Sequence, residues 1–276
     1  MIPKTSILET HFGKYMVWQS DGALFKRLAE IHVTRKDESL VQASKAIVEI
    51  LQNYSHNKVV LDIGANAGSY SIPQAIQFPE VQFFCFEVQR LVYYQLCGNI
   101  FLNSLDNVFT YHVAIGDENR YIDIPVIADY SQVNNVGGYT LDSEALKNIR
   151  KMSRNEILKS DKTTKIAMRT IDSMRELPLA GLIKIDVEGQ EHGVLIGAEN
   201  YIKRSGYPPI FFEAWNYFWH QEKKNNLLNY LKDIGYEFFE DCFDGNILAQ
   251  SSKTSKVLLN FNKQKDGITI QQSIKK

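Results

Sequence analysis

The sequence is short of cysteine and of net charge, and these deficits exclude several classes of protein. Its three cysteines show no CxxC spacing, so a secreted disulfide framework is not expected. The 31 basic and 32 acidic residues leave a net charge of −1, which offers no field to attract nucleic acid or anionic lipid. No stretch approaches the ~18 apolar residues of a membrane span, and the start of the chain lacks a signal-sequence pattern. We therefore expect a cytoplasmic protein without a transmembrane segment.

Hydrophobic periodicity predicts helices and strands in alternation. The predicted core strands are 58–64, 81–87, 108–115, 182–187 and 208–215. The predicted helices are 39–55, 69–78, 88–103, one that carries Val194, Leu195, Ala198, Tyr201 and Ile202, and 221–233. This alternation predicts an α/β fold with a mostly parallel sheet and helices on both faces. Strands at 236–243 and 256–261 are joined by too short a segment for a helical crossover, which predicts an antiparallel hairpin at one edge.

A glycine-rich turn follows the first core strand. The run DIGANAG holds Asp62, Gly64, Asn66 and Gly68. Glycine lets a backbone approach a ligand closely and adopt positive φ, and Asn also tolerates the left-handed region. The spacing departs from the G-x-G-x-x-G of dinucleotide-binding proteins, which disfavours NAD. The alternative is that these glycines only form a tight strand-to-helix turn.

A second signal is Glu87, which ends the next predicted strand 25 residues after Asp62. A carboxylate at this position accepts hydrogen bonds from a ribose diol. The alternative is that Glu87 only caps the following helix near its positive end. The combination of the turn with Glu87 favours a ligand site.

A third signal is the run KIDVEGQE at the end of the fourth core strand. Lys184 and Asp186 are two residues apart, so they share a face of the strand and can pair, while Glu188 lies just past the strand end. Glu213 ends the next strand. If the two strands are neighbours, the three carboxylates can perturb one another's pKa or hold a hard cation. The alternative is a charge network that caps the helix beginning near Gly189.

Five sequence blocks within roughly residues 38–215 match a known family in their order and spacing. They are VVLDIGANAG, FEVQRLVYYQLCGNIFLN, AIGD, RTIDSM and LIKIDVEGQEHGVLIGAEN. Together they resemble the FkbM family of S-adenosylmethionine-dependent methyltransferases. Val88 is the one departure, because the family usually has proline after the acidic residue. The resemblance implies a Rossmann-like class I methyltransferase fold with a seven-stranded sheet and an antiparallel edge strand. It also implies transfer of a methyl group to a hydroxyl oxygen.

Residue roles follow from the resemblance position by position. The implied contacts to S-adenosylmethionine are Asp62, Gly64, Asn66, Gly68, Glu87 and Asp117. The candidate bases or metal ligands on the acceptor side are Asp186, Glu188, Glu213 and His192. A carboxylate or imidazole beside the acceptor can take the hydroxyl proton as the methyl moves. A divalent metal stays an open alternative.

The sequence pattern also divides the chain. Residues 38–263 are expected to form the methyltransferase domain, with an insertion at 128–164 that contains NNVGGYT followed by a charged helical stretch. Residues 1–37 are expected to be an N-terminal extension that can cover the acceptor side, and residues 264–276 a frayed tail. Insertions of this length often cover sites.

The expected acceptor is a hydroxyl of a sugar in a glycan or glycolipid, or of a specialised metabolite. The aromatic run FFEAWNYFWH can stack on sugar faces or can simply pack in the core. One rival function is a nucleic-acid ribose 2′-O-methyltransferase, which the near-zero net charge disfavours. The other is a non-catalytic protein that binds S-adenosylmethionine. The sequence does not fix the oligomeric state.

Overall fold

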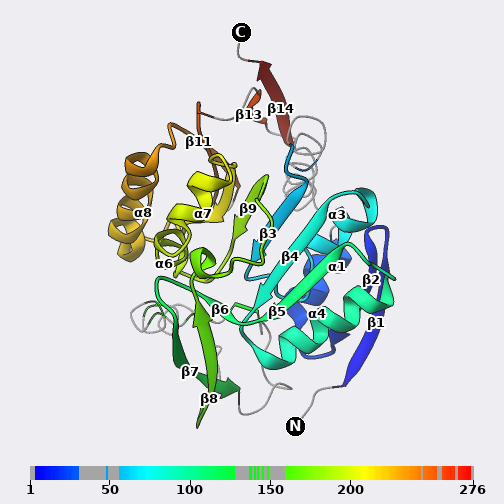
Figure 1. Ribbon diagram of the computed structural model, residues 1–276. Coiled ribbons are helices and arrows are strands. Elements are labelled where there is room, and N and C mark those ends of the chain that lie inside the picture. The colour runs from blue at the N-terminus through cyan, green and yellow to red at the C-terminus, as the bar shows by residue number, and fades with distance from the viewer. Residues whose placement is uncertain are drawn as a thin grey trace.

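A computed structural model describes residues 4–30, 48, 56–127, 137–138, 140, 142, 145, 148, 159–243, 245–253, 257–264 and 267–274. The described chain folds around one large twisted sheet with helices on both sides (Figure 1). Among these residues, no helix is long and apolar enough to cross a membrane. Of the predicted helix 39–55, only residue 48 is described, and it is helical.

The large sheet has seven strands in the order β11-β12-β10-β9-β3-β4-β5. Their bounds are β3 (Val59–Ile63), β4 (Gln82–Glu87), β5 (Val108–His112), β9 (Leu182–Ile185), β10 (Ile210–Glu213), β11 (Phe238–Phe243) and β12 (Asn246–Gln250). Five neighbouring strands, from β10 to β5, are parallel. The mostly parallel α/β sheet that the alternation predicts is therefore confirmed.

The antiparallel strand lies one position in from the edge. β12 runs antiparallel to both β10 and β11. The sequence instead predicts that 236–243 pairs with 256–261, and that pairing is wrong. The polypeptide reverses at Gly245, which has a φ of +86° and an ideal Cβ position only 3.0 Å from the Ala214 carbonyl oxygen. The reversal allows Asn246–Gln250, a strand that hydrophobic periodicity does not reveal, to enter the sheet.

The two faces of the sheet are covered by different helices. On one face Val60, Phe83 and Cys85 pack with Ile72 and Leu96, which belong to α3 (Ser71–Gln77) and α4 (Arg90–Leu102). Their strand neighbours project to the other face, because successive side chains of a strand alternate.

On that other face, Leu61, Ile63 and Phe84 pack with Tyr201 and Leu231. The covering helices are α6 (Glu191–Ile196), α7 (Glu199–Arg204) and α8 (Gln221–Ile234). The central strand β3 is therefore buried along its whole length, as expected for a parallel sheet with both faces covered.

One predicted helix is split in two. The apolar stripe from Val194 to Ile202 is divided between α6 and α7, which are separated at Gly197. An ideal Cβ at Gly197 would lie 2.0 Å from the Gly116 carbonyl oxygen. This close backbone contact fixes the break, and a helical repeat cannot reveal it.

A smaller sheet lies beside the large one. β6 (Ala114–Ile115) pairs in parallel with β8 (Lys159–Arg169), which pairs antiparallel with β7 (Arg120–Ile127). The predicted strand 108–115 is therefore divided between β5 and β6. Residues 159–164, expected in a charged helical stretch, belong to β8 instead. Most of the remaining insertion lies outside the described residues.

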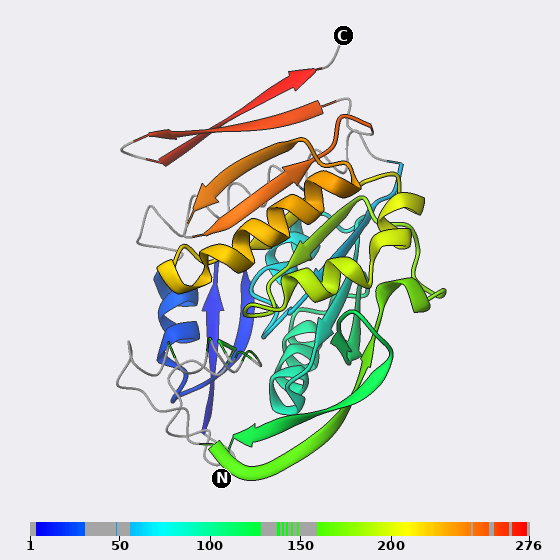
Figure 2. The same cartoon turned by 90° about the vertical axis from the view of Figure 1, so that its left-hand side faces the viewer.

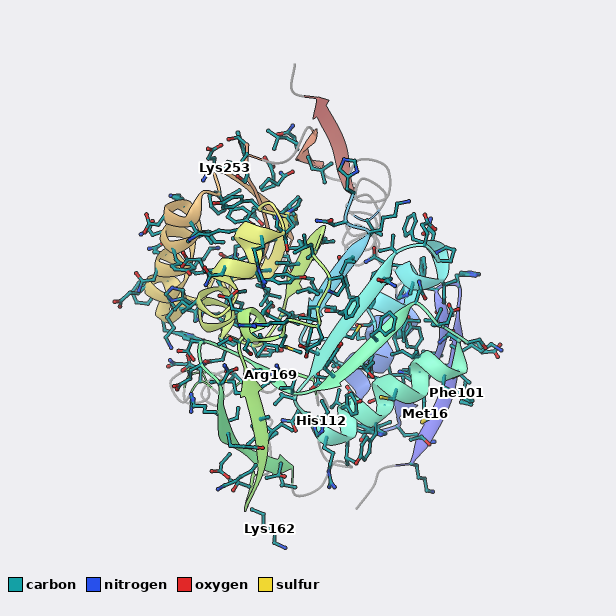
Figure 3. The ribbon with its side chains drawn as sticks, viewed as in Figure 1. Met16, Phe101, His112, Lys162, Arg169 and Lys253 are labelled. Carbon is teal, nitrogen blue, oxygen red and sulfur yellow. The ribbon has the colours of Figure 1, made fainter. Side chains whose placement is uncertain are left out.

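The N-terminal segment packs on α4. It comprises β1 (Thr5–Thr10), β2 (Gly13–Trp18) and α1 (Gly22–Glu30). The Met16 N–H donates to Asn99 Oδ1 at 2.6 Å, and the Lys14 N–H donates to Asn103 Oδ1 at 2.8 Å. Figure 3 shows Met16 beside α4. None of residues 4–30 lines the cavity described below.

Residues 257–274 form a separate hairpin of β13 (Val257–Gln264) and β14 (Gly267–Ile274). Figure 2 shows it beyond β11 and β12, at one end of the molecule. Most of the segment expected to be a frayed tail is therefore a strand, because all eight residues of β14 pair with β13.

Candidate active site

A cavity of about 600 Å³ opens at the carboxyl ends of the parallel strands. Its size is that of a small-molecule site. It lies between β3 and β9, where the chain continues through β4 to β5 on one side and to β10 on the other. Open α/β sheets bind ligands at such a switch point. Seven predicted site residues line it: Gly64, Asn66, Glu87, Asp117, Asp186, Glu188 and Glu213. Three predicted residues, Asp62, Gly68 and His192, do not line it.

The turn after β3 is fixed by backbone contacts. Gly64 has a φ of +84°, and an ideal Cβ there would lie 1.8 Å from the Asp186 carbonyl oxygen. Only glycine fits such an approach. The N–H groups of Gly64 and Ala65 both donate to the Phe86 carbonyl oxygen at 3.0 Å. Asn66 follows at a φ of 52°, a left-handed conformation that Asn tolerates. The turn therefore lies flat against the ends of β4 and β9.

Glu87 joins this turn to β4. One carboxylate oxygen accepts the Asn66 N–H at 3.0 Å, and the other accepts the Gln89 N–H at 2.7 Å. Burial raises the pKa of Glu87 to about 7, although the backbone N–H groups act in the opposite direction. A carboxylate has about four acceptor positions, so two bonds leave capacity for a ligand's hydroxyl groups.

Asp62 and Gly68 lie beneath the turn. Asp62 is fully buried, accepts the Ser71 hydroxyl at 2.6 Å and lies 3.0 Å from Lys184 Nζ. Gly68 has a φ of +87°, and an ideal Cβ there would lie 2.6 Å from Ile72 Cδ1. Both residues make structural contacts and neither lines the cavity, so their contacts with the ligand stay a prediction. The motif shows which residues form the turn but not which side chains face the cavity.

Lys184 links the two sides of the cavity. Its buried ammonium lies 3.0 Å from Asp62 and 3.4 Å from Asp186, and it donates to the Gly64 carbonyl oxygen at 3.4 Å. Burial disfavours the charged form, but the two carboxylates outweigh it and hold the pKa of Lys184 above its usual range. The predicted pairing of Lys184 with Asp186 is confirmed.

Three carboxylates gather across the cavity from the β3 turn. Asp186 and Glu188 follow β9, Glu213 ends β10, and one oxygen of each lies within 4.8 Å of the others. The proximity predicted from neighbouring strands is confirmed, since β9 and β10 pair in register. Such a cluster can accept hydrogen bonds from a hydroxyl, take its proton, or bind a hard cation.

His192 lies away from this cluster. Its ring packs edge-on against Tyr230 of α8, with 5.2 Å between ring centroids, and burial lowers its pKa. The prediction that His192 belongs to the site is not supported by this geometry. As the second residue of α6, it projects toward the neighbouring helix and not toward the strand ends.

Sequence reasoning misses two features of the site. Glu191 is buried, and its carboxylate accepts the N–H groups of Val187 and Gly189. Gly137 and Gly138 line the cavity, and an ideal Cβ at Gly137 would lie 1.8 Å from Asn66 Nδ2. The paired glycines of NNVGGYT are the only sequence signal of this contact.

Comparison with known proteins identifies the family. The family model described as the methyltransferase FkbM domain matches residues 62–238, more than half of the chain. The chain belongs to the FkbM methyltransferase family. The 2-O-methyltransferase NoeI of Sinorhizobium fredii (strain NBRC 101917 / NGR234) is 27% identical to this FkbM protein over 203 residues, covering 71% of this chain and 79% of NoeI.

Solved structures overlap with this FkbM protein at low identity. The methyltransferase FkbM of Methylobacillus flagellatus KT is 18% identical, with a TM-score of 0.43, and the match covers 69% of this chain and 43% of that one. The chain thus spans less than half of that structure. The precorrin-6y C5,15-methyltransferase of Geobacter metallireducens GS-15 is 13% identical, with a TM-score of 0.44 and coverage of 76% and 88%.

Family membership establishes an S-adenosylmethionine-dependent methyltransferase. The residues fit such a cofactor. A glycine turn lies beside a buried carboxylate on the adjacent strand, and the cavity between them and the acidic cluster has a volume of about 600 Å³.

Proposed function

We propose that this FkbM protein transfers a methyl group to a hydroxyl oxygen, most directly that of a sugar in a glycan or glycolipid, with a specialised metabolite as second choice. The observation that carries the proposal is the gathering of Asp186, Glu188 and Glu213 at one cavity. A hydroxyl must lose a proton when it accepts a methyl group, and carboxylates can take that proton. Kinship with NoeI, whose name states 2-O-methylation, supports a hydroxyl acceptor.

The β3 side of the cavity would hold the cofactor. Glu87 would accept the ribose hydroxyls, the Gly64–Asn66 turn would contact the methionine portion, and Asp117 would lie beside the adenine. When bound, S-adenosylmethionine supplies an electrophilic methyl group on a sulfonium. The residues contribute by holding donor and acceptor in line, which accounts for a large part of the rate in such reactions.

Glu188 and Glu213 are the better candidates for the base. Asp186 lies 3.4 Å from the buried ammonium of Lys184, so this carboxylate is already engaged in an ion pair. Glu188 lies three residues past the end of β9, Glu213 is the last residue of β10, and both line the cavity. We therefore assign proton removal to one of these two glutamates.

The same three carboxylates fit a divalent cation by their donor chemistry, since Mg²⁺ and Ca²⁺ prefer oxygen ligands. A bound cation would lower the pKa of the acceptor hydroxyl. Chelation separates the two versions. Methyl transfer that survives EDTA and gel filtration indicates that a glutamate removes the proton without a metal. Activity that is lost on chelation and restored by Mg²⁺ indicates that a bound cation takes part.

An aromatic cluster beside the acidic residues supports a sugar acceptor. The rings of Tyr217 and Trp219 are stacked, with 5.2 Å between centroids and 9° between planes, and Trp215 meets both edge-on at 63° and 66°. Trp215 is only two residues after Glu213 and lies 3.4 Å from an ideal Cβ at Gly189. Tyr217 and Phe218 are exposed. Rigid aromatic faces suit the apolar faces of sugar rings.

The proposal is tested with methyl-tritiated S-adenosylmethionine. The enzyme is incubated with methyl glycopyranosides and with cell extracts separated into glycan, lipid, protein and RNA fractions, and the label is located. Label in saccharide or glycolipid, stable to mild base as an ether is, supports the proposal. Label only in protein or RNA overturns the sugar acceptor and leaves the methyltransferase standing.

A further inference from the structure

A buried acid lies directly behind the acidic cluster. Glu191 is the first residue of α6 and is 4% exposed. It does not line the cavity. Its Oε1 accepts the Gly189 N–H at 3.0 Å and the Val187 N–H at 3.2 Å. One side-chain oxygen therefore accepts the N–H groups of the residues immediately before and after Glu188.

The turn that Glu191 holds has an unfavourable backbone. Glu188 has a φ of 55° and Gly189 a φ of 96°, so two successive residues adopt the left-handed side of the backbone map. A glutamate is rarely found there, and such a conformation persists only where its surroundings fix it. Acceptance of the N–H groups on both sides of Glu188 is a direct way to fix it.

The position of the turn decides where Glu188 lies. In this conformation one Glu188 oxygen lies within 4.8 Å of Asp186 and Glu213 oxygens, although like charges repel one another. Without the two hydrogen bonds, both the backbone strain and this repulsion favour movement of Glu188 away from the cluster. Strain and repulsion thus act together against the position that the proposed chemistry needs.

We propose that Glu191 is a positioning residue for methyl transfer, because its carboxylate holds the left-handed turn that places Glu188 at the cavity. The inference rests on the proposed role of Glu188 at the acceptor side. Glu191 touches neither donor nor acceptor. Its contribution therefore lies in turnover and not in the affinity for the cofactor.

The test compares three substitutions with a matched control. Glu191→Gln keeps an oxygen that can accept both N–H groups, Glu191→Asp keeps the charge but is one methylene shorter, and Glu191→Ala removes the acceptor. The control is Glu199→Ala, because Glu199 is also the first residue of a six-residue helix but pairs with Lys203 and Tyr230, outside the cavity lining.

The first readout is hydrogen–deuterium exchange of the Val187 and Gly189 amides, which needs no acceptor. Exchange should accelerate by about tenfold or more in Glu191→Ala, as expected for loss of a buried hydrogen bond. Glu191→Asp should behave similarly, whereas Glu191→Gln and Glu199→Ala should match the wild type. Unchanged protection in Glu191→Ala overturns the inference. If Glu191→Ala does not fold, equal protection in the Asp and Gln variants overturns it.

The second readout has two parts. One is the rate of methyl transfer to the acceptor fraction that takes up label in the experiment above, and the other is the affinity for S-adenosylhomocysteine, measured by calorimetry. Glu191→Ala should lower kcat about tenfold with cofactor affinity unchanged, and it should cost little more when added to Glu188→Gln. Additive losses in the double variant contradict action through Glu188. Failure to methylate any hydroxyl acceptor refutes the proposed function, whereas the exchange result still decides whether Glu191 holds the turn.

Discussion

The two sides of the cavity are held by different forces. On the cofactor side, the turn after β3 is fixed by backbone hydrogen bonds to Phe86 and Glu87 and by a glycine that no other residue can replace. On the acidic side, carboxylates from two strands approach within 4.8 Å. The Lys184 ammonium beside Asp186 offsets part of their repulsion, and Glu191 accepts two backbone N–H groups of the Glu188 turn. The first side therefore rests on hydrogen bonds and a tight backbone, whereas the second also needs an ion pair.

The largest effect is expected from removing Lys184, the residue that links the two sides. Lys184→Met leaves Asp62 buried and unpaired, which typically destabilises a protein by about 3–5 kcal/mol. Urea unfolding measures the loss. Lys203→Met is the matched control, because Lys203 pairs with Glu199 on the surface, where solvent screens an ion pair and its contribution to stability is small. Equal losses of unfolding free energy in the two variants would show that the buried Lys184 ion pairs stabilise the fold no more than the surface pair does.

A second substitution separates chemistry from binding. Glu188→Gln and Glu213→Gln should each lower turnover, by about 10²-fold or more for the one that removes the proton. Cofactor affinity should hardly change, because the loss arises in the transition state. His192→Gln serves as control and should retain activity, since His192 packs on Tyr230. Wild-type turnover in both Gln variants would refute the assignment of the base.

Titration sharpens the cofactor side. Burial raises the pKa of Glu87 to about 7, whereas ribose hydroxyls would favour its ionised form. S-adenosylhomocysteine should therefore bind more tightly as the pH rises from about 6 to 8, and Glu87→Gln should flatten that dependence. Calorimetry across this range measures both. An equally steep dependence in the Gln variant would assign the titration to another group.

The same shift has a consequence for the free protein. The folded state retains a proton on Glu87 that the unfolded chain, with a carboxyl pKa of about 4.3, releases earlier. Its contribution to stability is fully present below about pH 4.3 and is lost as the pH rises through about 7. Urea midpoints at several pH values should show a smaller loss across this window in Glu87→Gln.

The smallest expected effect concerns the aromatic cluster. Tyr217→Ala should raise KM for a saccharide acceptor several-fold, because a stacked aromatic contact contributes about 0.5–1.5 kcal/mol. KM for the donor should not change. Phe101→Ala is the control, since Phe101 is 87% exposed on α4. An unchanged acceptor KM in Tyr217→Ala would indicate that the cluster serves only packing.

The sequence predicts the local features of the site and misses those that depend on distant parts of the fold. The turn at Gly64 and the carboxylate at Glu87 are local features of strand ends, so the sequence identifies them. The motif cannot show that Asp62 and Gly68 face the interior, because that depends on Lys184 and Ile72 across the fold.

Longer-range pairing accounts for the remaining differences. β12 depends on a backbone reversal at Gly245. β8 carries many polar residues, and β7 contains Pro125, which argues against a strand in the sequence. Hydrophobic periodicity therefore misses all three. Glu191 is the last residue of the motif KIDVEGQE. Its role depends on the backbone conformation of Glu188, which the residue types alone do not reveal.

The central claim is that the cavity has a cofactor side and an acceptor side. The most direct test measures, by calorimetry, the affinity of the Glu87→Ala and Glu188→Gln variants for S-adenosylhomocysteine. Loss of charge-assisted bonds to the ribose should weaken binding to Glu87→Ala by about 10- to 100-fold, whereas Glu188→Gln should bind as the wild type does. Equal affinities in the two variants, or a greater loss in Glu188→Gln, would contradict this account.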